Sequence, residues 1–101
     1  MPGVPAVATS PIDSVRLRAA AELLRAMGAN EIFLFGSAAR NELTSHSDVD
    51  IAVRGLPAAR FFAAASAATD ALNRPVDLVD LDDPSPGVRY LLSSGELVRV
   101  L

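Results

Sequence analysis

The fold of this chain is decided by the stretch FLFGSAAR, residues 33–40, and by the stretch SDVDIAV, residues 47–53. The first is an apolar strand that ends in a Gly-Ser turn, and the second is an apolar strand that carries two carboxylates. Successive side chains of a strand point to opposite faces, so Asp48 and Asp50 share one face while the valine and isoleucine after them face the core. The two carboxylates lie about 7 Å apart along the backbone, near enough to bind one divalent cation or a pair of them.

The turn at Gly36 and Ser37 strengthens this interpretation. Glycine lets the backbone approach a ligand closely, and Ser37 offers an N–H and a hydroxyl at the start of a short helix, where anions are favoured. Each feature alone has an ordinary interpretation. The turn is then a simple strand exit, Asp48 a cap at the start of a strand, and Asp50 an edge residue facing water. Together, two charges on an apolar strand beside this turn favour a site for phosphate and metal.

A third carboxylate is expected from the apolar strand over residues 76–81, which contains Asp77 and Asp80. Their spacing of three places them on opposite faces of the strand. Asp77 lies in mid-strand, where an unpaired carboxylate is costly unless a cation meets it, whereas water reaches Asp80 at the strand end. We therefore predict Asp77 as the third metal ligand, with a solvated edge position as the alternative.

Three other side chains near these stretches are candidates for a role. Arg40 projects from the short helix after the turn, where it pairs either with a triphosphate or with Glu42. His46 lies in the loop before the carboxylate strand, and we assign it no role, with contact to a base or a metal-bound water as the alternative. Tyr90 is expected to be an ordinary contact between a helix and the core.

Length and composition limit the possible functions. A chain of 101 residues that is 50% hydrophobic fits one compact domain, which we place at residues 10–101 after a flexible tail over residues 1–9. The net charge of −3 and the scattered arginines argue against direct binding of nucleic acid. No cysteine is present, which suits a cytoplasmic protein, and neither a membrane-spanning run nor a secretory start is found.

The remaining pattern predicts alternating helices and strands. A helix is expected from an N-cap at Ser10 to Gly28, with its buried stripe at Ile12, Val15, Ala19, Leu23 and Met27. Further elements are expected at residues 31–35 (strand), 38–42 (short helix), 48–53 (strand), the region of residues 61–72 (helix), 76–81 (strand) and 88–93 (helix). Residues 95–101 form either a short strand or an arm that packs on a partner. The fold class is α/β (α+β), a small mixed sheet flanked by helices.

Three of these stretches together resemble the signature of a known family. FGSAARNE, residues 35–42, SDVDI, residues 47–51, and VDLV, residues 76–79, are similar to the signature of the minimal nucleotidyltransferases of the DNA-polymerase-beta-type superfamily. The resemblance covers residues 15–101, and one departure is Asn41, where many members carry glycine. It implies a polymerase-beta-type fold with a catalytic triad of metal-binding carboxylates, Asp48, Asp50 and Asp77, that holds two Mg²⁺ ions. It also implies that Gly36 and Ser37 bind the phosphates of ATP, and we add Arg40 to that group.

Minimal members of this family resemble the antitoxin half of HEPN/MNT toxin-antitoxin modules, whose HEPN toxin is an all-helical RNase. The resemblance implies that this chain transfers AMP from ATP onto a tyrosine hydroxyl of such a toxin, with which it forms a hetero-oligomer. Two alternatives stay open. In the first, the chain is a nucleotidyltransferase that modifies a small molecule. In the second, it is an antitoxin that neutralises its toxin by binding alone.

Overall fold

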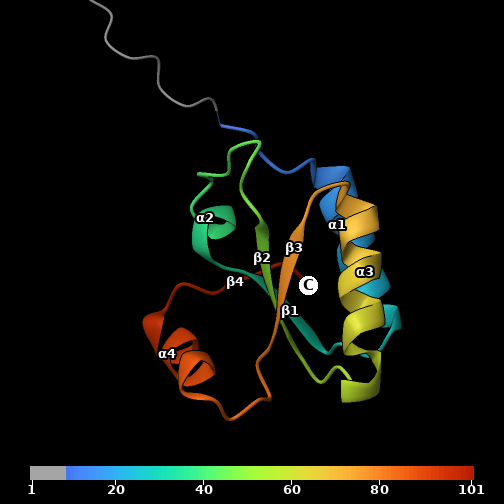
Figure 1. Ribbon diagram of the computed structural model, residues 1–101, viewed down its shortest axis with the longest axis vertical. Helices are drawn as coiled ribbons and strands as arrows, with labels where there is room; N and C mark the ends of the chain where they lie inside the picture. The colour runs from blue at the N-terminus through green and yellow to red at the C-terminus, as the bar shows by residue number, and fades with distance from the viewer. Residues whose placement is uncertain (1–8) are drawn as a thin grey trace, which may run out of the picture.

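The computed structural model describes residues 9–101, so the predicted tail over residues 1–9 lies, except for Thr9, outside the described residues and stays a prediction. Helices and strands alternate along the chain as the sequence predicts (Figure 1). The elements are α1 (Ser14–Ala26), β1 (Glu31–Leu34), α2 (Gly36–Ala39), β2 (Val49–Arg54), the 3₁₀ turn η1 (Ala58–Arg60), α3 (Phe61–Leu72), β3 (Val76–Asp80), α4 (Pro86–Ser94) and β4 (Val98–Arg99).

The strands form one mixed four-stranded sheet in the order β3-β2-β1-β4. β1 pairs antiparallel with β2 and with β4, whereas β2 and β3 run parallel, connected by α3. The end of the chain is therefore a short strand that pairs with β1, one of the two alternatives for residues 95–101. The predicted fold class, a small mixed sheet flanked by helices, is confirmed.

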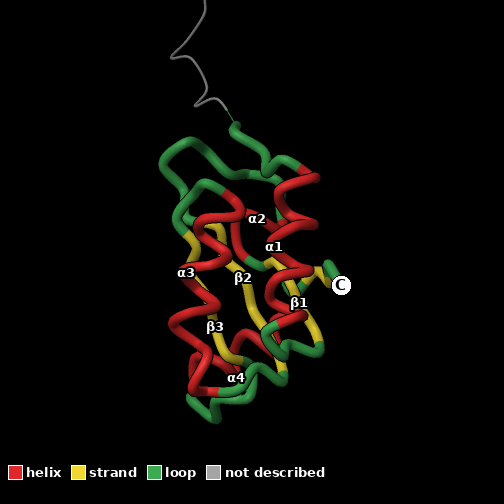
Figure 2. Tube along the Cα trace, turned by 90° about the vertical axis from the view of Figure 1, so that its right-hand side faces the viewer, coloured by secondary structure: helices red, strands yellow, loops and turns green. Residues whose placement is uncertain are grey.

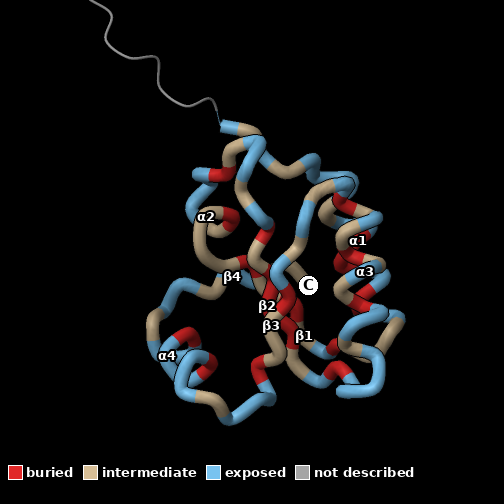
Figure 3. Tube along the Cα trace, viewed as in Figure 1, coloured by how far each residue is buried: buried red, intermediate tan, exposed pale blue. Residues whose placement is uncertain are grey.

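The main core lies between one face of the sheet and the helices α1 and α3, which cover that face side by side (Figures 1 and 2). Val49 and Ile51 of β2 point into it and are 0% and 1% exposed, as their alternation with the carboxylates predicts. On α3 the buried positions are the alanines 64 and 68 and Leu72. The small side chains of the two alanines let α3 approach α1 and the sheet closely, and buried residues are concentrated on this side (Figure 3).

The start of α1 differs from the prediction. The N-cap is Asp13, whose carboxylate accepts hydrogen bonds from the backbone N–H groups of Val15 and Arg16 at 2.9 and 3.3 Å. Ser10 does not cap the helix, because it lies four residues before Ser14, where its backbone N–H donates to the carbonyl of Leu43 at 2.6 Å. Residues 10–13 therefore precede the helix without regular secondary structure, and the Asp13 carboxylate satisfies N–H groups of the first turn.

The buried face of α1 also differs. The predicted stripe included Val15 and Leu23, but these side chains are 75% and 43% exposed. The helix instead buries Ala20, Ala21 and Leu24. The predicted stripe advances by three residues once and then by four at each step, so it drifts around the helix, and only its end residues Ile12 and Met27 pack against the core.

α4 covers part of the other face of the sheet. It is capped by Ser85, whose Oγ accepts from the Val88 N–H at 3.3 Å, and Pro86 occupies its first turn. Val88 and Leu91 pack with Ala52 and Leu81 into a small second core. The expectation that Tyr90 contacts the core is wrong, because α4 turns this side chain outward and leaves it 72% exposed.

None of the helices described between residues 9 and 101 is long and apolar enough to cross a membrane.

The position of α1 gives a matched pair of substitutions. Leu24→Ala removes a side chain that is 0% exposed and is expected to lower the free energy of unfolding by about 2–5 kcal/mol, since it leaves a cavity. Leu23→Ala, the same change one residue earlier at a 43% exposed position, is expected to cost less than about 1 kcal/mol. Urea unfolding of both variants measures the difference, and equal losses would contradict the observed face of α1.

Candidate active site

The parallel pairing of β2 with β3 brings two of the predicted site residues together. Asp50 and Asp77 are direct partners in the register, as are their neighbours Ile51 and Leu78. Paired strands lie about 4.8 Å apart, and residues opposite each other project from the same face. Asp50 and Asp77 therefore stand side by side on the face opposite the main core, at adjacent positions of neighbouring strands.

Asp48 precedes β2 by one residue and completes this group, the carboxylate face, defined here as Asp48, Asp50 and Asp77. Asp50 is half-buried, whereas Asp48 and Asp77 are exposed. The expectation that Asp77 is shielded in mid-strand is wrong, because β3 is an outer strand of the sheet. Asp77 is nevertheless the carboxylate that faces Asp50. Asp80 is the last residue of β3 and is half-buried, and its Oδ1 accepts from the Asp82 N–H of the following turn at 2.9 Å.

The carboxylate face carries more negative charge than its surroundings neutralise. Burial raises the pKa of Asp50 above its ordinary value, and the negative charges of Asp77 and Asp48 raise it further, while Arg40 opposes them. A raised pKa means that the folded chain disfavours the ionised carboxylate. A cation bound here would reverse this penalty, so the electrostatics of the face suit a positively charged ligand.

The Gly-Ser turn lies directly against Asp50. α2 begins at Gly36, two residues before the predicted start, and Gly36 has a φ of +59°. A Cβ added at Gly36 would collide with Oδ2 of Asp50, so only glycine allows this approach. The backbone N–H of Phe35 donates to the carbonyl of Asp50 at 3.1 Å and fixes the turn on β2. Of the predicted phosphate-binding residues, Gly36 thus lies against Asp50, and Ser37 follows it in α2.

Arg40 makes two ion pairs. Its Nε lies 2.7 Å from Oε1 of Glu42, the partner weighed from the sequence, and its Nη1 lies 3.7 Å from Oε1 of Glu96. The second contact ties α2 to the segment that follows α4. All three side chains are about half exposed, so these pairs are weak and exchangeable. Arg40 is near enough to Asp50 to affect its pKa.

Arg74 is a residue of the site's support that the sequence analysis missed. Its guanidinium donates to the carbonyl of Ser10 and to the carbonyl of Thr44, both at 2.5 Å. These bonds hold the loop that leads into Asp48, within which Ser47 also bonds to Thr44. No local pattern signals this role, because the partners lie 64 and 30 residues away. His46 is an exposed residue of the same loop.

The donor set fits magnesium, which prefers carboxylate oxygens. The raised pKa of Asp50, caused by burial and by the negative charges of Asp77 and Asp48, is the feature that fits a cation. Within residues 9–101 no three His, Cys, Asp or Glu side chains are already grouped tightly enough to hold a metal ion. Because Asp48 and Asp77 are exposed, their side chains can change rotamer on the nanosecond timescale and turn toward Asp50.

A small mixed sheet that presents adjacent carboxylates beside a Gly-Ser turn defines the class: a nucleotidyltransferase of the polymerase-beta type. The chain belongs to the family described as Polymerase beta, Nucleotidyltransferase, which residues 12–99 match. The resemblance inferred from the sequence motifs is thereby confirmed, and with it the expectation of an enzyme. A comparison with curated proteins gave no match.

Several solved structures are similar to this chain. A toxin-antitoxin structure with AMP-PNP is 27% identical with a TM-score of 0.70, covering 87% of this chain and 72% of that chain. A candidate minimal nucleotidyltransferase is 26% identical with a TM-score of 0.72, covering 85% of this chain and 90% of that one. A tri-AMPylated Shewanella oneidensis HEPN toxin in complex with an MNT antitoxin gives 27% identity and a TM-score of 0.61, with coverage of 84% and 68%.

The contact between Gly36 and Asp50 predicts a selective defect. Gly36→Ala is expected to displace the Asp50 carboxylate and to reduce nucleotidyl transfer at least about 10²-fold, because a misplacement of about 1 Å costs that much. Gly95→Ala is the control, since Gly95 also has a positive φ, +74°, but nothing lies within 4 Å of its added Cβ. Both variants carry the same kind of backbone strain, so comparable stability with activity lost only in Gly36→Ala is the expected result. Equal activities would contradict the assigned role of the turn.

Proposed function

We propose that this chain is a metal-dependent antitoxin that transfers AMP from ATP to a tyrosine hydroxyl of a partner HEPN toxin. The observation that carries the proposal is the in-register pairing of Asp50 with Asp77, on the same face as Asp48 and against the Gly36 turn. This arrangement brings carboxylates that suit metal ions next to backbone that suits phosphates.

In this proposal Asp48, Asp50 and Asp77 hold two Mg²⁺ ions. The ions, when bound, supply charge neutralisation at the phosphates and a lowered pKa of the acceptor hydroxyl. Gly36 and Ser37 bind the phosphates of ATP through the turn, whose closeness to β2 keeps them beside the carboxylates. Arg40 exchanges Glu42 or Glu96 for a phosphate oxygen, because its present ion pairs are half-exposed.

The transfer itself is a substitution at phosphorus. The tyrosine oxygen bonds to the α-phosphorus of ATP, the bond from that phosphorus to the bridging oxygen breaks, and pyrophosphate leaves. The hydroxyl proton passes to solvent. This chain's residues contribute positioning and charge, which dominate catalysis of phosphoryl transfer.

The proposed partner and donor are supported by what the similar structures contain. One is a toxin-antitoxin structure with AMP-PNP, and another holds an AMPylated HEPN toxin with its MNT antitoxin. The identities of 26–27% are high enough to carry this as a proposal for the present chain. A reaction that consumes ATP, in a chain without cysteine, suits the cytoplasm.

The test is the intact mass of a co-expressed HEPN toxin. With the wild-type chain, the toxin is expected to gain mass in steps of one AMP. With Asp48→Asn/Asp50→Asn the gain is expected to fall at least about 10³-fold, since both ligand carboxylates beside the turn are lost. Peptide mapping of the modified toxin then locates the acceptor, which the proposal expects to be a tyrosine.

Glu22→Gln/Asp70→Asn is the matched control, because it removes the same two charges from exposed positions on α1 and α3, across the sheet. It is expected to leave the mass gain unchanged. An unmodified toxin that is still neutralised would contradict the proposed transfer and indicate neutralisation by binding alone. Turnover of a small molecule in the absence of any partner protein would contradict the proposed acceptor.

A further inference from the structure

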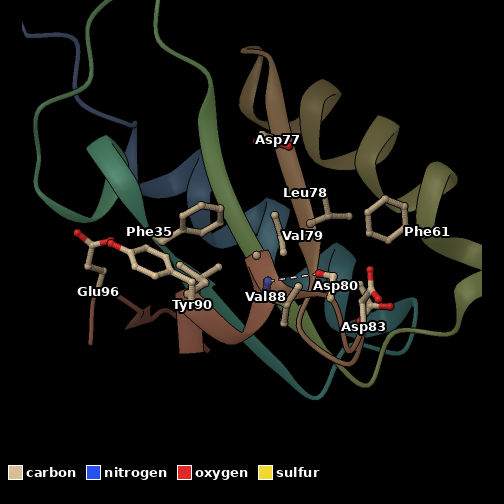
Figure 4. A pocket seen from close by; sticks show the side chains of 13 residues that line it. Phe35, Phe61, Asp77, Leu78, Val79, Asp80, Asp83, Val88, Tyr90 and Glu96 are labelled. Atoms are coloured by element: carbon tan, nitrogen blue, oxygen red, sulfur yellow. Dashed lines mark hydrogen bonds between the residues drawn. The ribbon is translucent and has the colours of Figure 1, made fainter. Parts of the chain in front are cut away.

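A groove of about 580 Å³ opens beside the carboxylate face (Figure 4). It runs along β3, the outer strand of the sheet, with α4 on one side and Phe61 at the start of α3 on the other. Asp77 lines one end of it, so the groove is continuous with the candidate active site. In Figure 4, Phe35 and Tyr90 lie on one side of β3, and Phe61 lies on the other.

The groove exists because α4 covers its face of the sheet only in part. The second core contains just two buried side chains from α4, Val88 and Leu91, and these reach Ala52 and Leu81. Phe35 and Val79 lie beside this core and are only partly buried, so they form an apolar floor. Tyr90, 72% exposed, adds an aromatic wall. Apolar side chains left open to water next to a catalytic face are typical of a surface that a ligand or partner covers.

The rim of the groove is acidic. Asp77, Asp80, Asp83 and Glu96 all line it, and no basic side chain does. None of the ion pairs found among residues 9–101 involves Asp77, Asp80 or Asp83. Only Glu96 has a cationic neighbour, Arg40 at 3.7 Å. An anionic nucleotide is repelled by such a rim, whereas arginine or lysine side chains are attracted to it.

The size of the groove agrees with a chain segment. Its volume of about 580 Å³ accommodates more than a single side chain. β3 is also the last strand of the sheet, so within residues 9–101 its outer edge is not paired with another strand. An extended segment laid along that edge would find both backbone partners and the apolar floor.

We propose that this groove docks the acceptor segment of the partner protein: an extended stretch that places an aromatic side chain on the Phe35–Val79 floor and arginine or lysine side chains against Asp80 and Asp83. The inference rests on the proposed function, and it adds which substrate approaches each side of the carboxylate face. The donor nucleotide binds on the Gly36 side, and the acceptor arrives from the groove side, past Asp77.

The test measures binding directly and does not need transfer. The probe is a fluorescein-labelled peptide with one tyrosine flanked on each side by two arginines, and its counterpart has glutamates in place of the arginines. Fluorescence anisotropy with the full chain is expected to show at least about tenfold tighter binding of the basic peptide, because several rim carboxylates act on it together. Saturating ATP with Mg²⁺ is expected not to displace it.

Two charge-reversal variants make the test specific. Asp83→Lys is expected to weaken binding of the basic peptide about tenfold, whereas Asp70→Lys, which changes the net charge equally from an exposed position on α3, is expected to change it less than about twofold. Tyr90→Ala, at a side chain exposed enough to leave folding intact, is expected to weaken the basic peptide several-fold.

Three results would overturn the groove assignment: equal binding of the two peptides, equal effects of the two lysine variants, or displacement of the peptide by ATP, which would make the groove a nucleoside site. Failure of the proposed function looks different. In that case the basic peptide binds and responds to Asp83→Lys, but the co-expressed toxin gains no AMP. Conversely, if the chain modifies the toxin but binds the two peptides equally, the proposed function stands and the groove assignment is wrong.

Discussion

The structure depends on the register between β2 and β3. In the observed register Asp50 faces Asp77, and Ile51 faces Leu78 in the main core. A slip of one residue would move the whole side-chain set of one strand to the opposite face, burying Asp77 against α3 and exposing Leu78. The apolar alternation that builds the core therefore also aligns the carboxylates, so folding and assembly of the site are one event.

This coupling divides the molecule into a stable side and an active side. α1 and α3 cover one face of the sheet with closely packed side chains, whereas the other face has only the small second core under α4. The active side keeps a carboxylate with a raised pKa, a turn that only glycine allows at Gly36, and an open groove. Each of these features opposes stability, and each is a place where a cation, a phosphate or a partner chain would be stabilised.

The sequence predicts what depends on local pattern. The strands, the shared face of Asp48 and Asp50 and the fold class follow from a period of two and from short motifs. The sequence did not predict contacts between distant segments, because nothing near Arg74 or Glu96 shows that folding brings them to the loop before Asp48 and to Arg40. The choice between Leu23 and Leu24 on α1 was missed for a different reason, since the predicted steps of four residues drift around the helix, whereas Leu24 stays on the face of Ala20 and Ala21.

The central claim is that Asp48, Asp50 and Asp77 form one cation site beside Gly36, and paramagnetic relaxation tests it most directly. Mn²⁺ titrated into ¹⁵N-labelled chain should broaden the amide resonances of residues 36–37, 48–50 and 77 first, and Asp50→Asn should abolish this selectivity. Selective broadening around Asp80 at the end of β3 and around Asp82 and Asp83 in the turn that follows, with residues 36–37 and 48–50 unaffected, would contradict the account.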